Sequence, residues 1–86
     1  MDLKQLRYFT TIAEMGQITS AAKKLYIAQP ALSHSIKLLE DELGVQLFER
    51  LPSGIRITGA GSLLLQKSYE ILNRVDSISV DLAEFK

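Results

Sequence analysis

The segment from Ile18 to Glu40 constrains the fold more than any other part of the chain. It holds two stretches with the apolar spacing of a buried helix face, separated only by Tyr26-Ile27-Ala28. The apolar positions of the first stretch are Ile18, Ala21, Ala22 and Leu25. Those of the second are Leu32, Ile36, Leu39 and Leu43. Because so short a connection allows only a tight turn, the segment predicts two helices in a helix-turn-helix arrangement.

The second of these helices is expected to expose a polar face. Gln29-Pro30 begins it, since a proline in the first turn loses no helical hydrogen bond. At about 100° per residue, Pro30, Ser33, His34 and Lys37 point away from the apolar line, with Gln29 at the N-terminal edge. Glutamine can pair with adenine, lysine with guanine or phosphate, and serine with either. Because the second helix of such a unit can enter a major groove, these five residues are candidates for contacts with double-stranded DNA.

The charge balance is the main objection to DNA binding, because such domains are often basic. The chain has 10 Lys and Arg against 10 Asp and Glu, a net charge of zero. The charges are unevenly distributed, however: Gln17 to Leu39 contains three lysines and no acidic residue. The acids Glu40-Asp41-Glu42 follow at the far end of the second helix. We therefore expect modest affinity per subunit and a need for dimerisation.

Composition argues against most other functions. The chain has no cysteine and a single histidine, so neither a thiolate site nor a histidine-cluster metal site is expected, and no cofactor is implied. The sequence contains neither a phosphate-binding loop nor a convincing acid–base pair, so it does not suggest an enzyme. Glu40-Asp41-Glu42 resembles a catalytic cluster only superficially, because consecutive helical residues point in different directions, and a solvated face is expected. The sequence shows neither a membrane-spanning run nor a signal peptide, which favours a cytoplasmic protein.

The flanking segments complete a small, mainly helical domain. Asp2 and Gly16 are suited to cap a helix over about residues 3–15, and the two later helices are expected at about 18–25 and 29–43, with Gly44 ending the last. Two short strands are then expected at 47–50 and 55–58, around a turn at residues 51–54. Such a hairpin is called a wing. It is expected to have Arg50 and Arg56 outward and an apolar side formed by Phe48, Ile55 and Ile57.

A long final helix is expected at about 59–85, capped by Thr58. It carries a heptad stripe that is apolar except for one serine: Leu64, Ser68, Ile71, Val75, Ile78, Leu82 and Phe85. A domain of this size cannot cover so long a stripe, so the pattern predicts a homodimer through this helix. Packing on an absent C-terminal domain is the alternative. Leu65, Tyr69 and Leu72 lie on a neighbouring face and are expected to pack on the first helix.

The combination AAKKL, QPALS, LE, LG, LFER and TGAG, at these spacings, resembles one family along essentially the whole chain. The chain is similar to the N-terminal DNA-binding domain and linker helix of bacterial LysR-type transcriptional regulators. The resemblance implies a winged helix-turn-helix domain over residues 1–58 and a linker helix for dimerisation over residues 59–86. It also implies antiparallel pairing of linker helices, frequent tetramers, and partly palindromic promoter sites. A C-terminal domain that binds a small-molecule inducer is absent here, which suggests a fragment of a longer regulator.

The resemblance also assigns roles to individual residues. Gln29, Pro30 and Ser33 match family positions that touch bases, and Arg50 matches an arginine of the wing that approaches the backbone or minor groove, although an ion pair with Glu49 is an alternative for it. Phosphate contacts are expected from Lys37 and Thr19. Lys24 is expected either to touch phosphate or simply to be solvated.

Several positions depart from the family pattern. His34 stands where the family usually has arginine, and Ser35 where it often has glutamine or arginine. The wing tip, Pro52-Ser53, lacks the usual basic residue, and Ala28 replaces a serine before Gln29. These departures predict fewer phosphate contacts and a shallower dependence of DNA affinity on salt than in a typical relative.

One alternative function remains open at the level of sequence. The neutral charge and the uncharged wing tip also suit a protein-interaction module that keeps the winged-helix shape without reading DNA. Removing Lys37 or Arg50 would leave the function of such a module intact, whereas charges at Ile71 or Val75 would abolish it.

Overall fold

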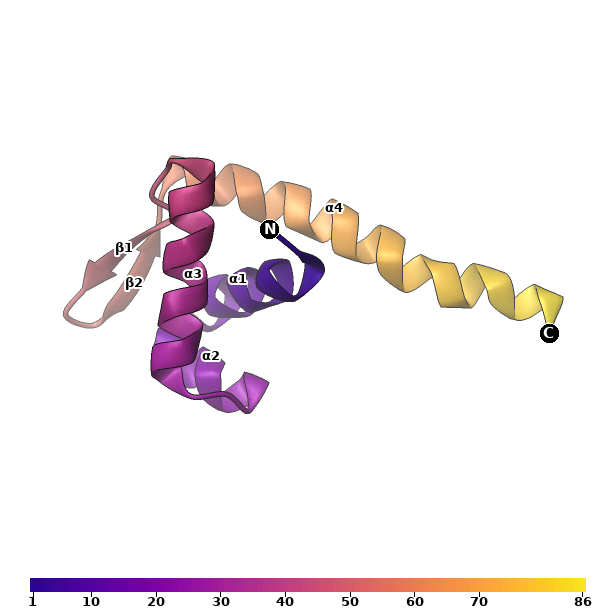
Figure 1. Ribbon diagram of the computed structural model, residues 1–86, viewed down its shortest axis with the longest axis horizontal. Helices are drawn as coiled ribbons and strands as arrows, with labels where there is room; N and C mark the ends of the chain where they lie inside the picture. The colour runs from indigo at the N-terminus through magenta and orange to yellow at the C-terminus, as the bar shows by residue number, and fades with distance from the viewer.

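The computed structural model describes residues 1–86, and it contains four α-helices and one antiparallel hairpin (Figure 1). In chain order the elements are α1 (Leu3–Met15), α2 (Ile18–Leu25), α3 (Gln29–Leu43), β1 (Phe48–Leu51), β2 (Gly54–Ile57), α4 (Gly59–Leu82) and the 3-10 turn η1 (Ala83–Phe85). Helices α1 to α3 and the hairpin form a head, and α4 projects from it as a rod (Figure 1). The molecule therefore measures 50 × 26 × 19 Å. The predicted winged helix-turn-helix fold with a long C-terminal helix is confirmed.

Local capping explains where α1 begins and where α1, α2 and α3 end. The Asp2 carboxylate accepts the backbone N–H of Gln5 at 2.7 Å, which satisfies one free donor at the start of α1. Gly16 and Gly44 end α1 and α3 in the left-handed conformation, with φ of 75° and 69°. Tyr26 ends α2 with φ of 58° and is the one non-glycine residue in that region.

The core lies where α1, α2 and α3 meet the start of the hairpin. Its fully buried apolar side chains include Phe9, Ile12, Leu32, Leu39 and Leu47. The Phe9 and Phe48 rings pack with centroids 5.1 Å apart, which fastens β1 to α1. The prediction that Leu43 is buried was wrong, since its side chain is 36% exposed. The chain turns at Gly44 just beyond it, and Leu47 closes this end of the core instead.

Each strand of the hairpin lies one residue nearer the turn than predicted, while the pairing of the strands is unchanged. Its strands cover 48–51 and 54–57 rather than 47–50 and 55–58, because the turn is shortened to Pro52-Ser53. The backbone N–H of Ile55 donates to the Gly16 carbonyl at 3.2 Å and ties the hairpin to the end of α1. A Cβ at Gly54 would lie 2.7 Å from the same carbonyl oxygen, so this close approach requires glycine.

Helix α4 begins against the head and then leaves it. The Thr58 hydroxyl accepts the Gly61 N–H at 3.0 Å and caps the helix. Leu72 is buried and Leu65 half-buried, as expected for a face that packs on α1 and the core. Tyr69 is more exposed than expected and lies at the edge of this contact. Partial burial and the neighbouring Glu14 carboxylate raise the pKa of its phenol.

The final helix is interrupted near its end. The α-helix stops at Leu82 and continues as η1, so the predicted single helix to Phe85 is three residues too long. Arg7 of α1 forms an ion pair with Asp76 of α4 at 3.1 Å, near the point where the two helices separate. None of the helices combines the length and apolar character needed to cross a membrane.

Candidate nucleic-acid interface

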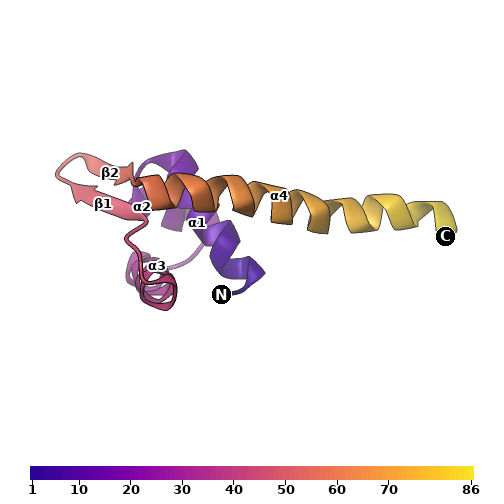
Figure 2. The same cartoon turned by 90° about the horizontal axis from the view of Figure 1, so that it is seen from above.

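Helix α3 stands out from one side of the head, where Figure 2 shows it nearly end-on. Its apolar residues Leu32, Ile36 and Leu39 are buried against the other helices, which leaves its polar face turned outward. The connection from α2 is held by the Ile27 N–H, which donates to the Ala22 carbonyl at 3.1 Å. The orientation of α3 is thus fixed by the core rather than by its own surface.

The N-terminal turns of α3 carry an ordered polar pair. The Gln29 amide donates to the Ser33 hydroxyl at 2.8 Å, and both side chains are half-buried. Pro30 and His34 beside them are exposed. The hydrogen bond limits the motion of Gln29 and Ser33, so less conformational entropy is lost when they bind a ligand.

Lys37 does not point freely into solvent. Its ammonium donates to the Asp41 carboxylate one turn later, at 2.9 Å. This hydrogen bond and the negative charge of Asp41 raise the pKa of Lys37 above its ordinary value. The acids lie at the far end of α3, as expected, but Asp41 still reaches back to Lys37. Any phosphate near Lys37 must compete with this carboxylate.

The prediction of a solvated Glu40 was wrong. Its carboxylate accepts the backbone N–H of Leu47 at 2.7 Å and, more weakly, that of Phe48 at 3.4 Å. Glu40 is half-buried and caps the entrance to β1. It therefore fixes the hairpin relative to the end of α3.

Both arginines of the hairpin are exposed, as expected, but they lie on opposite faces. Arg50 shares the face of Phe48 and Ile55, which corrects the expectation that it points away from the apolar side. Glu49 is opposite Arg56 in the antiparallel register, and the two form an ion pair with a 3.2 Å hydrogen bond from Nε. Arg50 is opposite Ile55 and shares its face with Phe48. Glu49, the alternative partner for Arg50, is thus taken by Arg56.

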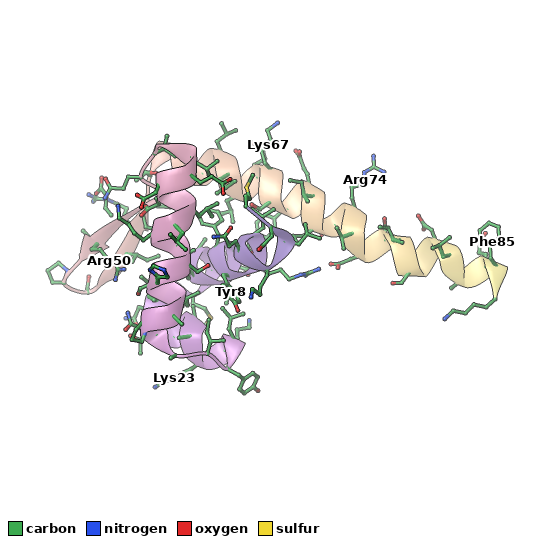
Figure 3. All side chains as sticks on the ribbon, viewed as in Figure 1. Tyr8, Lys23, Arg50, Lys67, Arg74 and Phe85 are labelled. Carbon is green, nitrogen blue, oxygen red and sulfur yellow. The ribbon has the colours of Figure 1, made fainter.

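Arg50 faces the helices and has no carboxylate partner of its own. It lines one groove with Thr19 and Gln29, between the hairpin and the beginnings of α2 and α3. It also lines a second groove with Ser33 and Lys37, along α3. Figure 3 shows Arg50 on the hairpin side of α3. The structure therefore brings these five candidates onto one polar surface.

Lys24 lies apart from that surface. It is exposed in the last turn of α2 and lines neither groove, and the adjacent Lys23 marks that end of α2 in Figure 3. Sequence reasoning missed Gln17, which lines the groove beside Thr19 and donates to the Ser53 carbonyl at 3.4 Å. Its position just before α2 was the only signal for it, since its partner lies far along the chain.

The expected dimerisation stripe divides into a covered and an uncovered part. Leu64 is half-buried against the core, Ser68 is fully buried, and Val75 is half-buried. The remaining members lie on the projecting part of α4 and are exposed: Ile71, Ile78, Leu82 and Phe85. The uncovered part is a single apolar line along the rod.

Residues 3–62 match the family described as "Bacterial regulatory helix-turn-helix protein, lysR family". The chain belongs to this family. It is 49% identical over 87 residues to the HTH-type transcriptional regulator BsdA of Bacillus subtilis, and 44% identical over 73 residues to ClcR of Pseudomonas putida. These matches cover 100% and 85% of the chain, but 30% of BsdA and 25% of ClcR. The chain thus spans less than a third of the length of these relatives.

Solved structures of the lysR family have the same fold. A BenM_DBD complex with benA site 1 DNA matches all of the chain and all of its own length, with a TM-score of 0.94 and 40% identity. A CbnR_DBD–DNA complex covers 98% of the chain and 95% of its own, with a TM-score of 0.87 and 38% identity. The head and the projecting α4 are therefore both family features.

Proposed function

We propose that this lysR-family chain is a sequence-specific DNA-binding module of a transcription regulator. One observation carries the proposal: α2, α3 and the hairpin place Thr19, Gln29, Ser33, Lys37 and Arg50 on one polar surface. The family match supports it, as do the BenM and CbnR domains that share this fold and are bound to DNA.

In this proposal the surface divides the work of recognition between two kinds of contact. Arg50, Thr19 and Lys37 bind phosphates and set the position of the head on the duplex. Helix α3 lies in the major groove, where the Gln29 amide, the Ser33 hydroxyl and the His34 ring reach base edges. Pro30 supplies an apolar contact in the same groove, and the hairpin lies over the flanking backbone or minor groove.

We further propose that two copies pair through α4. The exposed apolar line from Ile71 to Phe85, with Val75 beside it, is too large to remain in water on a rod with no other partner. A pair of copies presents two α3 helices to a partly palindromic site, and pairs can assemble further into tetramers in a full-length regulator. We assign inducer binding to a C-terminal domain outside these residues, and action to the cytoplasm. No catalytic role is part of this proposal.

Selection of duplexes from a random-sequence pool by the purified chain, at about 0.1 M salt, tests the proposal. We expect enrichment of a two-fold palindrome. In the Gln29→Ala variant one base position of each half-site should lose its preference, at a cost of roughly 1–3 kcal/mol. The matched control is Gln66→Ala, because Gln66 is exposed on α4 and far from the polar surface.

The outcome separates this function from its rival. Equal loss of affinity for selected and random DNA in Gln29→Ala would contradict base reading. No binding to any DNA would favour the second candidate, a protein-interaction module. The neutral net charge of the chain and the ion pair of Lys37 with Asp41 also favour that candidate. That candidate predicts that Lys37→Ala and Arg50→Ala leave function intact, while charges at Ile71 or Val75 abolish it.

A further inference from the structure

An apolar groove opens where the end of α3 and the following loop meet the start of α4. Its walls are Leu43, Val45, Ala60, Leu63 and Leu64, with the stem of Lys67 at one rim and Leu47 at its floor. Leu43, Val45 and Leu63 expose more than a third of their side-chain surface there. Nothing in the chain itself covers these side chains, and they lie outside the polar surface assigned to DNA.

The groove and the uncovered stripe lie on the same side of α4. At about 100° per residue, Leu64, Lys67, Ile78 and Phe85 fall within a sector of about 60°. The face that packs on α1, centred near Leu72, is turned away from this sector by roughly 100°. Figure 3 shows Lys67 and Phe85 projecting from the same side of the rod. The apolar surface is therefore continuous from the groove to the tip of α4.

This continuous surface is complementary to itself when two copies run antiparallel. In a two-fold interface, contacts occur twice: if one position of the first copy contacts another position of the second copy, the same two positions also meet with the copies exchanged. Pairing Ile71 with Ile78 of a second copy places the axis between Arg74 and Val75. Leu64 and Phe85 then lie at equal distances from that axis, each about 16 Å away at 1.5 Å per residue. Phe85 of one copy thus arrives at the groove of the other.

We propose that Phe85 of a second copy fills this groove and sets the register of the α4 pair. The inference rests on the homodimer proposed above and specifies its contacts. Phe85 is 82% exposed in the single chain, the most exposed of the apolar stripe residues, and its ring has no other partner. A parallel pair would leave both grooves empty and bring the two heads to the same end of the rod.

Charge at the rim of the groove favours the same register. Lys67 forms no ion pair within its own chain, and neither does Asp81. In the antiparallel pair, Lys67 faces Leu82 of the second copy. Asp81 of that copy directly precedes Leu82, so its carboxylate lies beside Lys67. An exposed pair of this kind adds little affinity, but it disfavours a slipped register.

Disulfide trapping tests the register directly, because the chain has no cysteine of its own. The variant Leu63→Cys/Phe85→Cys should oxidise to covalent dimers, since a disulfide forms only between residues whose Cα atoms lie within about 7 Å. The matched control is Leu63→Cys/Val80→Cys. Val80 is 70% exposed but lies about 140° around α4 from Phe85. We expect at least tenfold more covalent dimer from the first variant under the same oxidation.

Charge reversal gives an independent measurement by sedimentation equilibrium. Lys67→Glu should weaken the dimer about threefold or more, and Lys67→Glu/Asp81→Lys should restore it. Phe85→Ala should raise the dimer dissociation constant about tenfold without changing the circular dichroism spectrum, since its ring packs on nothing in the single chain.

The failures of this inference and of the proposed function are distinguishable. Suppose that the chain selects a palindrome but the two cysteine variants cross-link equally, or the reversed charges do not restore the dimer. The proposed function then stands and the groove assignment is overturned. A chain that stays monomeric also overturns it. If the cross-link forms but no DNA is bound, the groove assignment stands and the DNA-binding proposal falls.

Discussion

Lys37 and Asp41 hold each other on the outer face of α3, and this pair limits what the face offers to DNA. A DNA phosphate can contact Lys37 only by displacing the Asp41 carboxylate. That carboxylate then remains close to the negatively charged DNA backbone. Asp41 therefore lowers affinity in two ways, by occupying Lys37 and by repelling phosphate. In a chain with no net charge, one such carboxylate has a large relative effect.

Replacing this carboxylate should strengthen DNA binding. In Asp41→Asn we expect affinity to rise about threefold at 0.1 M salt, because the freed Lys37 can bind phosphate. One additional phosphate contact should also steepen the slope of log affinity against log salt by about 0.9. Titrations of the selected duplex at several salt concentrations measure both quantities.

The double variant Lys37→Ala/Asp41→Asn is the control for this explanation. It should lose the added slope, because no lysine is then available to release a counterion. If Asp41→Asn gains the same slope with and without Lys37, the effect comes from repulsion by Asp41 alone and the competition for Lys37 is disproved. The pair could have been recognised from sequence, since Lys37 and Asp41 have the i, i+4 spacing of a helical ion pair.

At the scale of elements, the start of α4 is fixed by a close approach to the core. A Cβ at Gly61 would lie 2.3 Å from the Leu47 carbonyl oxygen and 2.7 Å from Ile57 Cγ1. The obstruction is backbone, so a larger residue can be accommodated only if α4 moves away from the hairpin. The direction in which the rod leaves the head thus depends on the absence of a Cβ atom at Gly61.

Two glycines two residues apart allow a matched comparison. Gly61→Ala should lower the free energy of unfolding by about 2 kcal/mol, the usual cost of overpacking. Gly59→Ala should be neutral or stabilising by up to about 1 kcal/mol, since a Cβ there meets nothing within 4 Å and alanine favours the helix. Urea unfolding followed by circular dichroism measures both. Equal effects in the two variants would show that helix propensity, and not the contact with Leu47, decides the outcome.

The elements that sequence predicted well are those whose ends are set locally. The bounds of α1 and the end of α3 agree with the structure because Asp2, Gly16 and Gly44 each act within one turn of the helix end that they set. The pairing register of the hairpin agrees with the prediction, and only the strand ends differ by one residue, because Gly54 is placed by the distant Gly16 carbonyl. Strand alternation already puts Arg50 on the face of Phe48, but which helix that face meets depends on contacts between distant segments.

The same distinction applies to the candidate interface. Gln29 and Ser33 were predictable because helical periodicity alone puts both near the N-terminal end of the polar face. The bond from Glu40 to the Leu47 N–H was not, since it joins a helix to a strand that begins after a loop without regular pattern. Ser68 interrupts an otherwise apolar stripe, and only the closeness of the head explains why a serine there is fully buried.

The whole molecule joins the polar surface proposed to bind DNA to the exposed apolar rod proposed to bind a second copy, and the two lie on different parts of the chain. The head alone offers few cations, of which Lys37 is partly neutralised. In the proposed function, affinity for a specific site therefore comes from two heads acting together, which pairing through the rod would hold at a fixed separation. Linked binding of this kind exceeds the affinity of one head by about 10² to 10⁴ without any new contact to DNA.

Disrupting the rod should therefore weaken DNA binding without touching the polar surface. In Ile78→Asp we expect the affinity for the selected palindrome to fall by about 100-fold or more, because a buried charge prevents pairing of α4. Ile78 is 55% exposed and lies beyond the head, so the thermal stability of the head should not change.

Val80→Asp is the control, since Val80 lies on the opposite side of the same rod and should tolerate the charge. Fluorescence anisotropy on the palindrome and on a single half-site measures the effect: Ile78→Asp should bind both about equally weakly. Full palindrome affinity in a variant shown by sedimentation to be monomeric would mean that one head suffices.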